Sequence, residues 1–358
     1  MEYINYFNIC KRLHLWRFMK ATIYDIANKA GVSTATVSRA LGDKSDTVKP
    51  ETRKKIIQIS DDLNFRPNSL AKNLAKRTTS AIGLVLPDIQ GDFYNQIIKG
   101  VDEIAFSGGY HLIVASSHSK RNIVESLLGF MRESLVDGVI LMIPSMNSQL
   151  EDVLAKYKIP VVIINDIQAF DKYDIVSINN YQGAYSIIDY TIKSLNHSKI
   201  AMITGPAGNH DSQMRKKGYT CALKEAGITI RKDWIIEGDF TTKGGELACS
   251  RILSMKEKPD VIFAANDNMA AGCYNVAESL GLKIPKDIGI IGFDHIELGS
   301  FLRPKLTTVH VPASEIGKTS TQLLINRLSN KEENSFEPKN IKISTGIIIG
   351  DSVTKLNN

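Results

Sequence analysis

The chain has 358 residues, of which 43% are hydrophobic and 23% are charged. This balance excludes an intrinsically disordered protein, because disordered chains have too few apolar residues to build a core. No apolar run approaches the roughly 20 residues that cross a bilayer, which argues against an integral membrane protein. The length predicts about two to three domains.

The four cysteines, Cys10, Cys221, Cys249 and Cys273, are scattered along the chain. None forms a Cys-x-x-Cys pair, and their spacing fits neither a disulfide framework nor a zinc site. The seven histidines are also dispersed. We therefore expect no metal, no cofactor and a reducing, cytoplasmic location, with association to the bacterial nucleoid if the protein binds DNA.

The formal net charge of +6 is unevenly distributed along the sequence. Residues 20–80 contain 12 lysines and arginines against six acidic residues, whereas residues 81–358 contain 29 against 31. A small basic module before a nearly neutral body is typical of a protein whose head binds a polyanion.

The first 18 residues do not form a secretory signal. Lys11, Arg12 and Arg17 interrupt the apolar residues, and no small-residue cleavage site follows them. Met19 begins a sequence that is typical of a natural start. We interpret residues 1–18 as an extension that is not part of the native structure and arises from an upstream start codon. A mobile basic arm is the alternative.

Three short helices are predicted in the basic segment. Thr22 is placed to cap the first, because its hydroxyl can accept an unpaired backbone N–H. Gly31 supplies a tight turn, Ser33 caps the second helix, and Pro50 opens the third. Two short helices around a glycine turn form a helix-turn-helix.

The second of these helices suits the major groove of DNA. It carries small hydroxyl residues and a single arginine, Arg39, on its exposed side. Small side chains allow close approach, and arginine can read guanine bidentately. Pro67 then opens a further apolar stripe of about eight residues, which is marginal as an isolated helix. We expect this stripe to fold only with DNA and the same segment of a second chain.

The sequence from residue 22 to residue 74 resembles the head and hinge of the lactose/galactose-repressor (LacI/GalR) family. The matching runs are Thr-Ile-Tyr-Asp-Ile-Ala at 22–27, Gly-Val-Ser at 31–33, Thr-Val-Ser-Arg at 36–39 and Asn-Phe-Arg-Pro-Asn at 64–68. The resemblance implies a homodimer with one recognition helix in each major groove of a near-palindromic operator. Paired hinge helices would wedge a leucine into the central minor groove.

The resemblance also implies which residues contact operator DNA. Thr34, Ala35 and Arg39 occupy the base-reading positions, and Leu74 occupies the wedge position. The full DNA-binding set is Thr22, Tyr24, Ser33, Thr34, Ala35, Thr36, Ser38, Arg39, Asn68, Ala71 and Leu74.

From residue 81 the pattern changes to apolar strands that alternate with amphipathic helices. We predict strands at 82–86, 112–115, 139–143, 161–164, 200–203, 234–237, 261–264 and 288–291. Helices are predicted at 93–106, 123–135, 150–157, 214–226, 244–255 and 268–280. Near-continuous apolar runs are typical of parallel strands covered on both faces. The fold class is therefore α/β, with two doubly wound halves after an all-α head.

The family resemblance covers about residues 20–350, and the body resembles periplasmic sugar-binding proteins. We expect a helix-turn-helix head at 19–66, a hinge helix at 67–78, and an effector-binding and dimerisation domain at 79–352. One half of this domain takes about 79–178 and 310–340. The other half takes about 179–309 and 341–352.

Polar and aromatic residues follow the predicted strands, where ligands bind in such folds. Carboxylates and amides bind vicinal hydroxyls, arginine is a planar fork of donors, and an aromatic ring packs on the apolar face of a sugar. The expected effector-binding residues are Asp88, Phe93, Tyr94, Asn165, Arg215, Phe240, Asn266 and Asp294. Asp88 could instead be an ordinary loop residue, and Tyr94 could instead belong to the core. Asp267 is expected to cap the next helix.

The sequence departs from the family pattern at three residues, which lie in two places. Asn165 and Asp166 stand where the family usually has Asp-Arg, and Asn179 stands where it often has aspartate. Losing a fixed arginine argues against a phosphorylated or carboxylated ligand.

The sequence lacks the common motifs of enzyme active sites. Residues 312–319 resemble half of a phosphate-binding loop, but Pro312 lacks the backbone N–H that a phosphate nest needs. There is no Gly-x-Ser-x-Gly, no His-Glu-x-x-His and no cysteine–histidine dyad spacing. We expect no enzymatic activity.

These features predict a dimeric, operator-binding transcription regulator, a repressor, controlled by a sugar or related small metabolite. A catabolite-control-type regulator, activated by a phosphorylated partner protein, is one alternative. A sugar-binding transport component is another, although the helix-turn-helix and the lack of a signal peptide argue against it. No heptad pattern follows Asp351, which argues against a coiled-coil tetramer seam.

Overall fold

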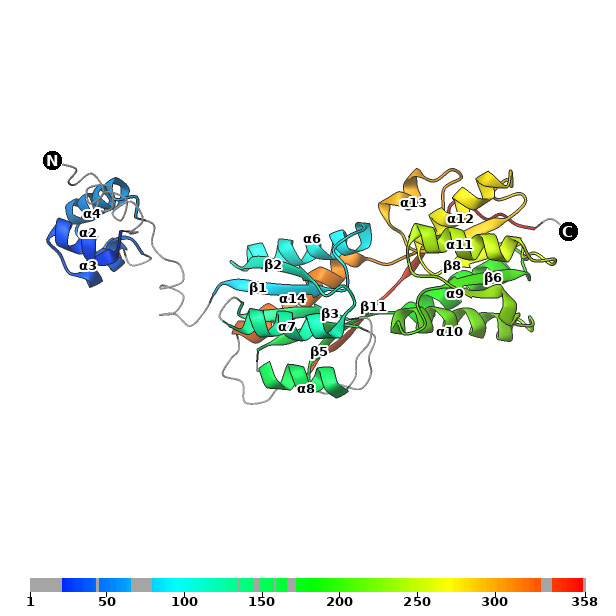
Figure 1. Cartoon of the computed structure of the whole chain (residues 1–358), viewed down its shortest axis with the longest axis horizontal. Helices are drawn as coiled ribbons and strands as arrows, with labels where there is room; N and C mark the ends of the chain where they lie inside the picture. The colour runs from blue at the N-terminus through cyan, green and yellow to red at the C-terminus, as the bar shows by residue number, and fades with distance from the viewer. Residues whose placement is uncertain are drawn as a thin grey trace, which may run out of the picture. The chain divides into compact units, whose positions relative to one another are not determined.

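The computed structural model of the chain describes residues 21–42, 45–65, 79–133, 136–143, 148–157, 159–165, 172–329 and 337–356. It divides into two compact units, Met1–Thr78 and Thr79–Asn358, shown in Figure 1. The expected hinge residues Asn68, Ala71 and Leu74 lie outside the described residues, as does the segment 1–18.

The first unit contains α2 (Ile23–Ala30), α3 (Thr34–Ala40), a 3-10 turn η1 (Ser45–Thr47) and α4 (Pro50–Asp62). The Thr22 hydroxyl accepts from the N–H of Asp25, whose carboxylate accepts in return from the Thr22 backbone at 2.8 Å. Ser33 caps α3 by accepting from the Thr36 N–H at 3.2 Å. These caps satisfy backbone donors that would otherwise be unpaired at the helix starts.

Three apolar side chains join the helices of the first unit. Ile26 from α2, Val37 from α3 and Ile56 from α4 are each fully buried in one cluster. The Lys55 ammonium also donates to the carbonyl of Ala30 at 3.1 Å, which closes the C-terminus of α2. The predicted helix-turn-helix is thus confirmed as a packed three-helix structure.

The second unit contains two six-stranded sheets. The first has the order β11-β5-β4-β3-β1-β2 and the second has the order β12-β10-β9-β8-β6-β7. Neighbouring strands are parallel, except that β12 pairs antiparallel with β10. The strands are β1 (Ala81–Leu86), β2 (His111–Ser116), β3 (Gly138–Met142), β4 (Val161–Ile164), β5 (Asp174–Ile178), β6 (Ile200–Thr204), β7 (Ile235–Glu237), β8 (Val261–Ala264), β9 (Gly289–Asp294), β10 (Thr307–His310), β11 (Asn340–Ile343) and β12 (Gly346–Ile348).

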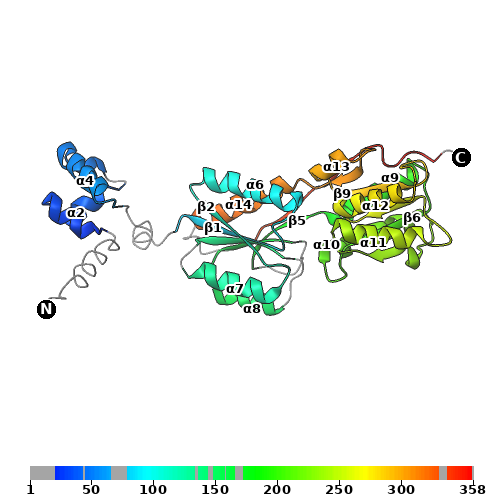
Figure 2. The ribbon, with the colours of Figure 1, turned by 45° about the horizontal axis from the view of Figure 1, so that its top comes forward.

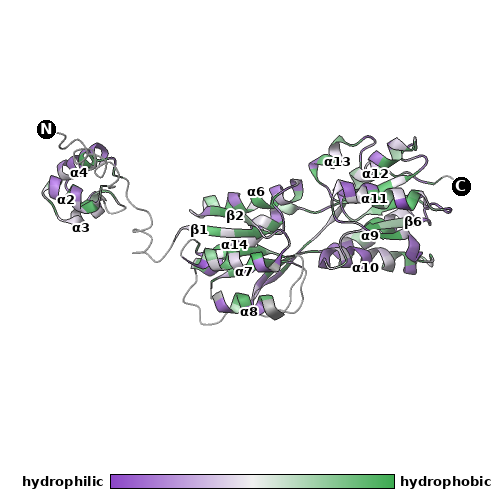
Figure 3. Cartoon of the chain, in the orientation of Figure 1, coloured by the Kyte–Doolittle hydropathy of each residue, from purple (hydrophilic) through white to green (hydrophobic). Residues whose placement is uncertain are grey.

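Helices cover both faces of each sheet, as Figure 2 shows for the first sheet. The helices on the first sheet are α6 (Asp92–Ser107) and α14 (Ala313–Ser329) on one face, and α7 (Arg121–Arg132) and α8 (Ser148–Tyr157) on the other. Those on the second sheet are α9 (Asn180–Lys193) and α10 (His210–Glu225), then α11 (Thr242–Leu253) and α12 (Asp267–Ser279). Two short helices, η2 (Lys232–Trp234) and α13 (Glu297–Phe301), complete the unit. The strands between these helices are largely apolar, as the hydropathy colouring in Figure 3 shows. The α/β fold class is therefore confirmed.

Helices α6 and α14 approach each other closely because each has a glycine at the contact. A Cβ on Gly100 would lie 2.0 Å from the carbonyl oxygen of Ser314, and one on Gly317 would lie 2.3 Å from that of Ile97. No helix in the described part of the chain is both long and apolar enough to cross a membrane.

Some predicted elements differ from the observed ones. The apolar run at 112–115 is expected to be covered on both faces, but it lies in β2, an edge strand whose side chains are partly exposed. Strand β5 is not among the predicted strands, because its apolar run is short and lies between two buried polar residues, Asp174 and Ser177. Asp174 pairs with Arg327 at 2.7 Å. Strand β11 pairs with β5, so the first sheet extends to Ile343 rather than ending near residue 340.

Candidate functional site

A cleft of about 850 Å³ lies at the carboxyl ends of the strands of the second unit and is lined by residues of both halves. This volume is within the range of small-ligand sites. Seven of the eight expected effector residues line it, namely Asp88, Phe93, Tyr94, Arg215, Phe240, Asn266 and Asp294. Sequence reasoning did not single out other polar lining residues, among them Asn209, Asp211 and Asn268.

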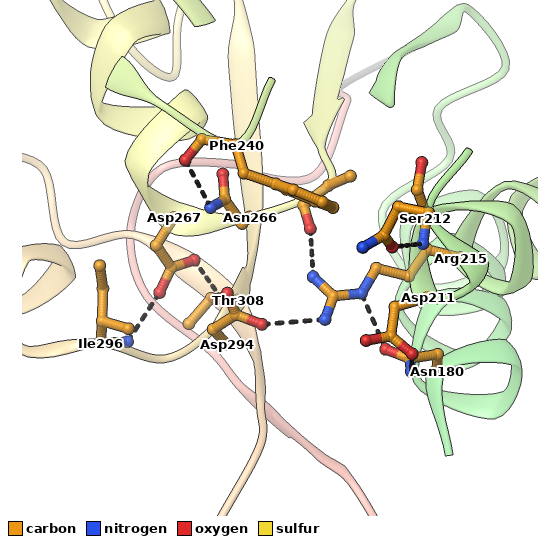
Figure 4. Close-up of polar contacts among 12 residues, drawn as sticks. Asn180, Asp211, Ser212, Arg215, Phe240, Asn266, Asp267, Asp294, Ile296 and Thr308 are labelled. Carbon is orange, nitrogen blue, oxygen red and sulfur yellow. Dashed lines mark hydrogen bonds and ion pairs between the residues drawn. The ribbon is translucent and has the colours of Figure 1, made fainter. Parts of the chain in front are cut away.

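Arg215, on α10, lies at the centre of the buried polar contacts in Figure 4. Its Nε donates to Asn180 Oδ1 at 2.8 Å, and its second nitrogen donates to the carbonyl oxygen of Ala265 at 2.5 Å. The third nitrogen lies 3.2 Å from the Asp294 carboxylate. The guanidinium also stacks 3.8 Å from the centroid of the Phe293 ring. Arg215 is thus held as a fixed positive charge at the base of the cleft.

Asp294, the last residue of β9, faces this guanidinium from the other side of the site. The contact is an ion pair of 3.2 Å to Asp294 Oδ1, a buried atom with no other polar partner among the described residues. Burial raises the pKa of this carboxyl to about 6, which Arg215 partly opposes and Asp211 reinforces. The carboxylate therefore remains mainly ionised at neutral pH, with acceptor capacity free for a ligand.

Asn266 and Phe240 are joined by a hydrogen bond at the rim of the site. Asn266 caps α12 by accepting from the Met269 N–H at 3.0 Å, and its amide donates to the Phe240 carbonyl at 3.0 Å. Phe240 has a φ of 67°, which is unusual for a residue with a side chain. Its ring lies where a Cβ on Gly205 would come within 2.1 Å of it. The glycine therefore leaves room for the ring beside the cleft.

The expectation that Asp267 caps α12 is wrong, because the cap is the preceding residue, Asn266. Asp267 is fully buried and accepts hydrogen bonds from the Ile296 N–H and the Thr308 hydroxyl. Burial, with the charge of Asp294, raises the pKa of Asp267 to about 8. Burial disfavours the charged form of a carboxyl, so Asp267 is stabilised in its protonated form.

Two aromatic residues of α6 approach the cleft from the first half. Phe93 and Tyr94 contact each other edge to face, with ring centroids 5.5 Å apart. Burial raises the pKa of Tyr94 to about 12, and the charges of Asp294 and Asp88 reinforce this, so the phenol keeps its proton. Asp88 accepts from the N–H groups of two following loop residues, at 2.7 and 3.1 Å, while it lines the cleft.

Asn165 does not join the other expected effector residues. It follows β4, and its amide donates to the carbonyl of Ile143 at 2.5 Å. It is buried and is not among the residues that line the cleft, so its expected contact with the effector stays a prediction. The position of a residue at a strand end does not show which way its side chain points.

In the first unit, the expected DNA-contacting residues that the structure describes lie at or near the surface. Ala35, Ser38 and Arg39 are exposed on α3, and Thr34 and Thr36 are half-buried. The Arg39 Nε makes a hydrogen bond of 3.3 Å to the Ala35 carbonyl, on the same helix. The Tyr24 side chain is 68% exposed, which is unusual for an aromatic residue without a partner surface. Thr22 and Ser33 also serve as helix caps.

Comparisons with known proteins cover both units. Residues 22–68 match the sequence profile of bacterial regulatory proteins of the lacI family, and residues 79–349 match that of periplasmic binding proteins and the sugar binding domain of the LacI family. The chain is 36% identical over 315 residues to catabolite control protein A of Priestia megaterium, which covers 88% of this chain and 94% of that protein. It is 34% identical over 338 residues to the HTH-type transcriptional repressor PurR of Photobacterium profundum, covering 94% of this chain and 100% of that protein.

A solved structure of the transcriptional regulator CelR in complex with cellobiose has a TM-score of 0.71 at 26% identity, and the match covers 93% of this chain and 99% of that one. Both sequence profiles and the whole-length relatives agree with the helix-turn-helix head and the two-sheet body. The chain belongs to the LacI family of DNA-binding transcription regulators.

Proposed function

We propose that this regulator is a repressor whose operator affinity is set by a small polyhydroxylated molecule, a sugar or a related metabolite, held in the cleft of the second unit. The observation that carries this proposal is the buried pair of Arg215 and Asp294, in which the ion pair with the guanidinium at 3.2 Å is the polar contact of Asp294 Oδ1 with the described residues, so the carboxylate keeps acceptor capacity. A ligand hydroxyl can donate to this carboxylate, whereas a fully ionised carboxylate or phosphate group cannot.

The surroundings of the pair suit a sugar more than an anion. The Phe240 ring offers an apolar face for packing, and Asn266 and Asn268 contribute amide groups to the lining. The lining carries five aspartates, against Arg215 and Lys120 as its lysine and arginine residues. The known complex of CelR with cellobiose supports a saccharide as the ligand class of a similar fold.

We further propose that the chain acts as a homodimer that binds operator DNA through α3. The division into a head at 19–66, a hinge at 67–78 and an effector domain at 79–352 belongs to this proposal. A ligand can change operator affinity only by binding two states of the regulator with different affinities. We therefore expect the effector to favour one arrangement of the two halves around the cleft.

Binding measurements with a panel of compounds test this function. Neutral mono- and disaccharides, sugar phosphates and purine bases would be titrated calorimetrically, and hits would be added to a DNA-binding assay on a selected operator. We expect a neutral saccharide to bind and to change operator affinity. A panel in which only the phosphorylated compounds bind would contradict the proposed ligand class.

The similarity to catabolite control protein A favours a second candidate. In that case a phosphorylated partner protein, rather than a sugar, raises operator affinity. A chain that binds no panel compound but gains DNA affinity when a phosphorylated partner protein is added would support this candidate over the first.

Replacing Arg39 with alanine should relax base discrimination at one operator position and cost about 1–3 kcal/mol on the preferred sequence. The reason is that Arg39 is exposed on α3, where a guanidinium can donate to guanine. Binding to a library of single-base operator variants measures the effect. Arg53→Ala on α4, another exposed arginine of the head, serves as the control. An equal loss on every sequence in Arg39→Ala would identify a phosphate contact instead.

Replacing Phe240 with alanine should weaken the effector roughly tenfold without changing which sugars bind, because the ring supplies packing rather than hydrogen bonds. Calorimetry with the panel measures both quantities. Phe106→Ala is the control, since Phe106 is 81% exposed near the end of α6 and does not line the cleft. A changed order of preference among sugars would show that the ring determines selectivity.

A further inference from the structure

We propose that the buried carboxyl of Asp267 is a positioning residue of the effector site, which holds the turn at residues 294–296 against strand β10 and so directs Asp294 toward Arg215. This inference rests on the proposed function of the cleft. It gives a role to a residue that does not line the cleft itself.

Three separate segments meet at this carboxyl, as Figure 4 shows. Asp267 begins α12, directly after β8. Its Oδ2 accepts from the backbone N–H of Ile296 at 2.9 Å, just beyond β9. Its Oδ1 accepts from the hydroxyl of Thr308, on β10, at 2.6 Å. One side chain therefore joins the start of α12, the turn after β9 and the next strand.

The backbone is shaped to admit this carboxyl. A Cβ on Gly292 of β9 would lie 2.1 Å from Asp267 Oδ1, so a larger residue there would displace it. The carboxyl thus occupies a space that the neighbouring strand leaves open by having glycine.

The turn that Asp267 holds is conformationally unfavourable on its own. Asp294 has a φ of 103° and His295 a φ of 58°, both in the region that residues with a side chain avoid. Such residues persist when the surrounding structure determines them. Several contacts do so here: Asp267 holds Ile296, the Val311 N–H donates to the Asp294 carbonyl at 3.2 Å, and Asp294 pairs with His310 of β10. Without Asp267, the turn that follows Asp294 would lose its side-chain restraint, and Asp294 would keep only its pairing with β10 and its ion pair with Arg215.

The same contacts connect the turn at residues 294–296 to a segment of the chain that crosses from one half of the second unit to the other. Strand β10 leads through Val311 and Pro312 into α14, which covers the first sheet. A shift of the 294–296 turn on ligand binding would therefore act directly on one of the crossing segments. This gives the effector a short covalent and hydrogen-bonded route from Asp294 to the other half.

A test without any effector follows from these contacts. Amide hydrogen exchange at Ile296 reports whether its N–H is still bound, and a carboxyl-carbon NMR titration reports the pKa of Asp294. The charged and titratable groups around Asp294 are Arg215, Asp211, Tyr94, Asp267, His295 and His310, and all except Asp267 remain in the variants below. In Asp267→Ala we expect exchange at Ile296 to rise at least tenfold. The pKa of Asp294 should fall from about 6 toward 3.8, because burial is the main cause of its rise.

Three further variants make the test specific. In Asp267→Asn the amide oxygen can accept from Ile296 and its NH₂ can donate to Thr308, so exchange should stay within about threefold of the parent. Thr308→Val removes one partner and should give an intermediate rise. Thr307→Val is the matched control on the same strand, because the Thr307 hydroxyl accepts from the Gly350 N–H at 3.0 Å and does not touch Asp267.

The proposal would be overturned if amide exchange at Ile296 and the pKa of Asp294 were unchanged in both Asp267→Ala and Thr308→Val. An equal rise of Ile296 exchange in the control Thr307→Val would also contradict it. So would a loss of Ile296 protection in Asp267→Asn. Thr308→Val keeps the test decisive if Asp267→Ala does not fold. Because this test uses no ligand, its outcome is independent of the sugar panel. A panel without sugar binding would contradict only the proposed function, and a negative result for Asp267 would contradict only this inference.

Discussion

Replacing Arg215 with alanine should abolish the effector response and lower ligand affinity by about 100-fold or more. The guanidinium binds Asn180 and Ala265 and neutralises Asp294, all within a buried site. Removing one partner of a buried ion pair leaves an uncompensated charge, which costs about 3–5 kcal/mol. Asp294 would then take up a proton more readily, and its oxygens would no longer be fixed acceptors for the ligand.

The measurement is calorimetric titration of the sugar identified in the panel, beside operator binding with and without that sugar. Operator binding without sugar should stay within about threefold of the parent, because the head forms a compact unit of its own. Arg231→Ala is the matched control, since Arg231 pairs with Asp233 and Glu257 on the surface of the same half. If the ligand affinity of Arg215→Ala stayed within threefold of the parent, the hypothesis that the effector binds in this cleft would be excluded.

Local signals in the sequence predicted the head well. Thr22, Gly31, Ser33 and Pro50 occupy the caps and turns expected of them, because capping depends on residues within one helical turn. The alternation of apolar strands and helices likewise predicted the two-sheet body, since hydrophobic periodicity follows burial. The prediction missed β5, which begins with a buried carboxylate, Asp174, whose charge is balanced by Arg327, 153 residues away.

In the site, too, the roles of single side chains depend on contacts with residues far away in the sequence. Asn266 and Asp267 are adjacent and both can cap a helix, so the sequence offers no basis for choosing between them. The choice depends on Ile296 and Thr308, which come 29 and 41 residues later. Arg215 was expected to donate to the ligand, but its partner Asn180 could not be found from spacing alone. Strand-end position therefore predicts which residues gather, whereas long-range contacts decide what each one does.

Replacing Asp267 with asparagine should make the second unit more stable at high pH than the parent protein. The pKa of Asp267 is about 8 in the folded chain and ordinarily 3.8. Below pH 3.8 both states hold the proton, so the group has no effect. Between pH 3.8 and 8 the folded state holds a proton that the unfolded state has released, and stability falls as pH rises, by at most about 1.4 kcal/mol per pH unit. Above pH 8 the loss is complete. Asparagine does not titrate and lacks this loss.

Urea unfolding at pH 5 and pH 8.5 measures the effect, and Trp234 is a suitable reporter because it is buried in the second unit. A Trp16→Phe background makes it the single tryptophan. The free energy of unfolding of Asp267→Asn minus that of the parent should be larger at pH 8.5 than at pH 5, by about 4 kcal/mol. Asp294 and the remaining ionisable groups are present in both proteins, so their contributions largely cancel in this difference. Thr307→Val, a buried substitution without a titrating group, should change stability equally at both pH values. An Asp267→Asn difference that is likewise independent of pH would mean that the folded protein holds this carboxyl ionised, with Ile296 and Thr308 stabilising its charge against burial.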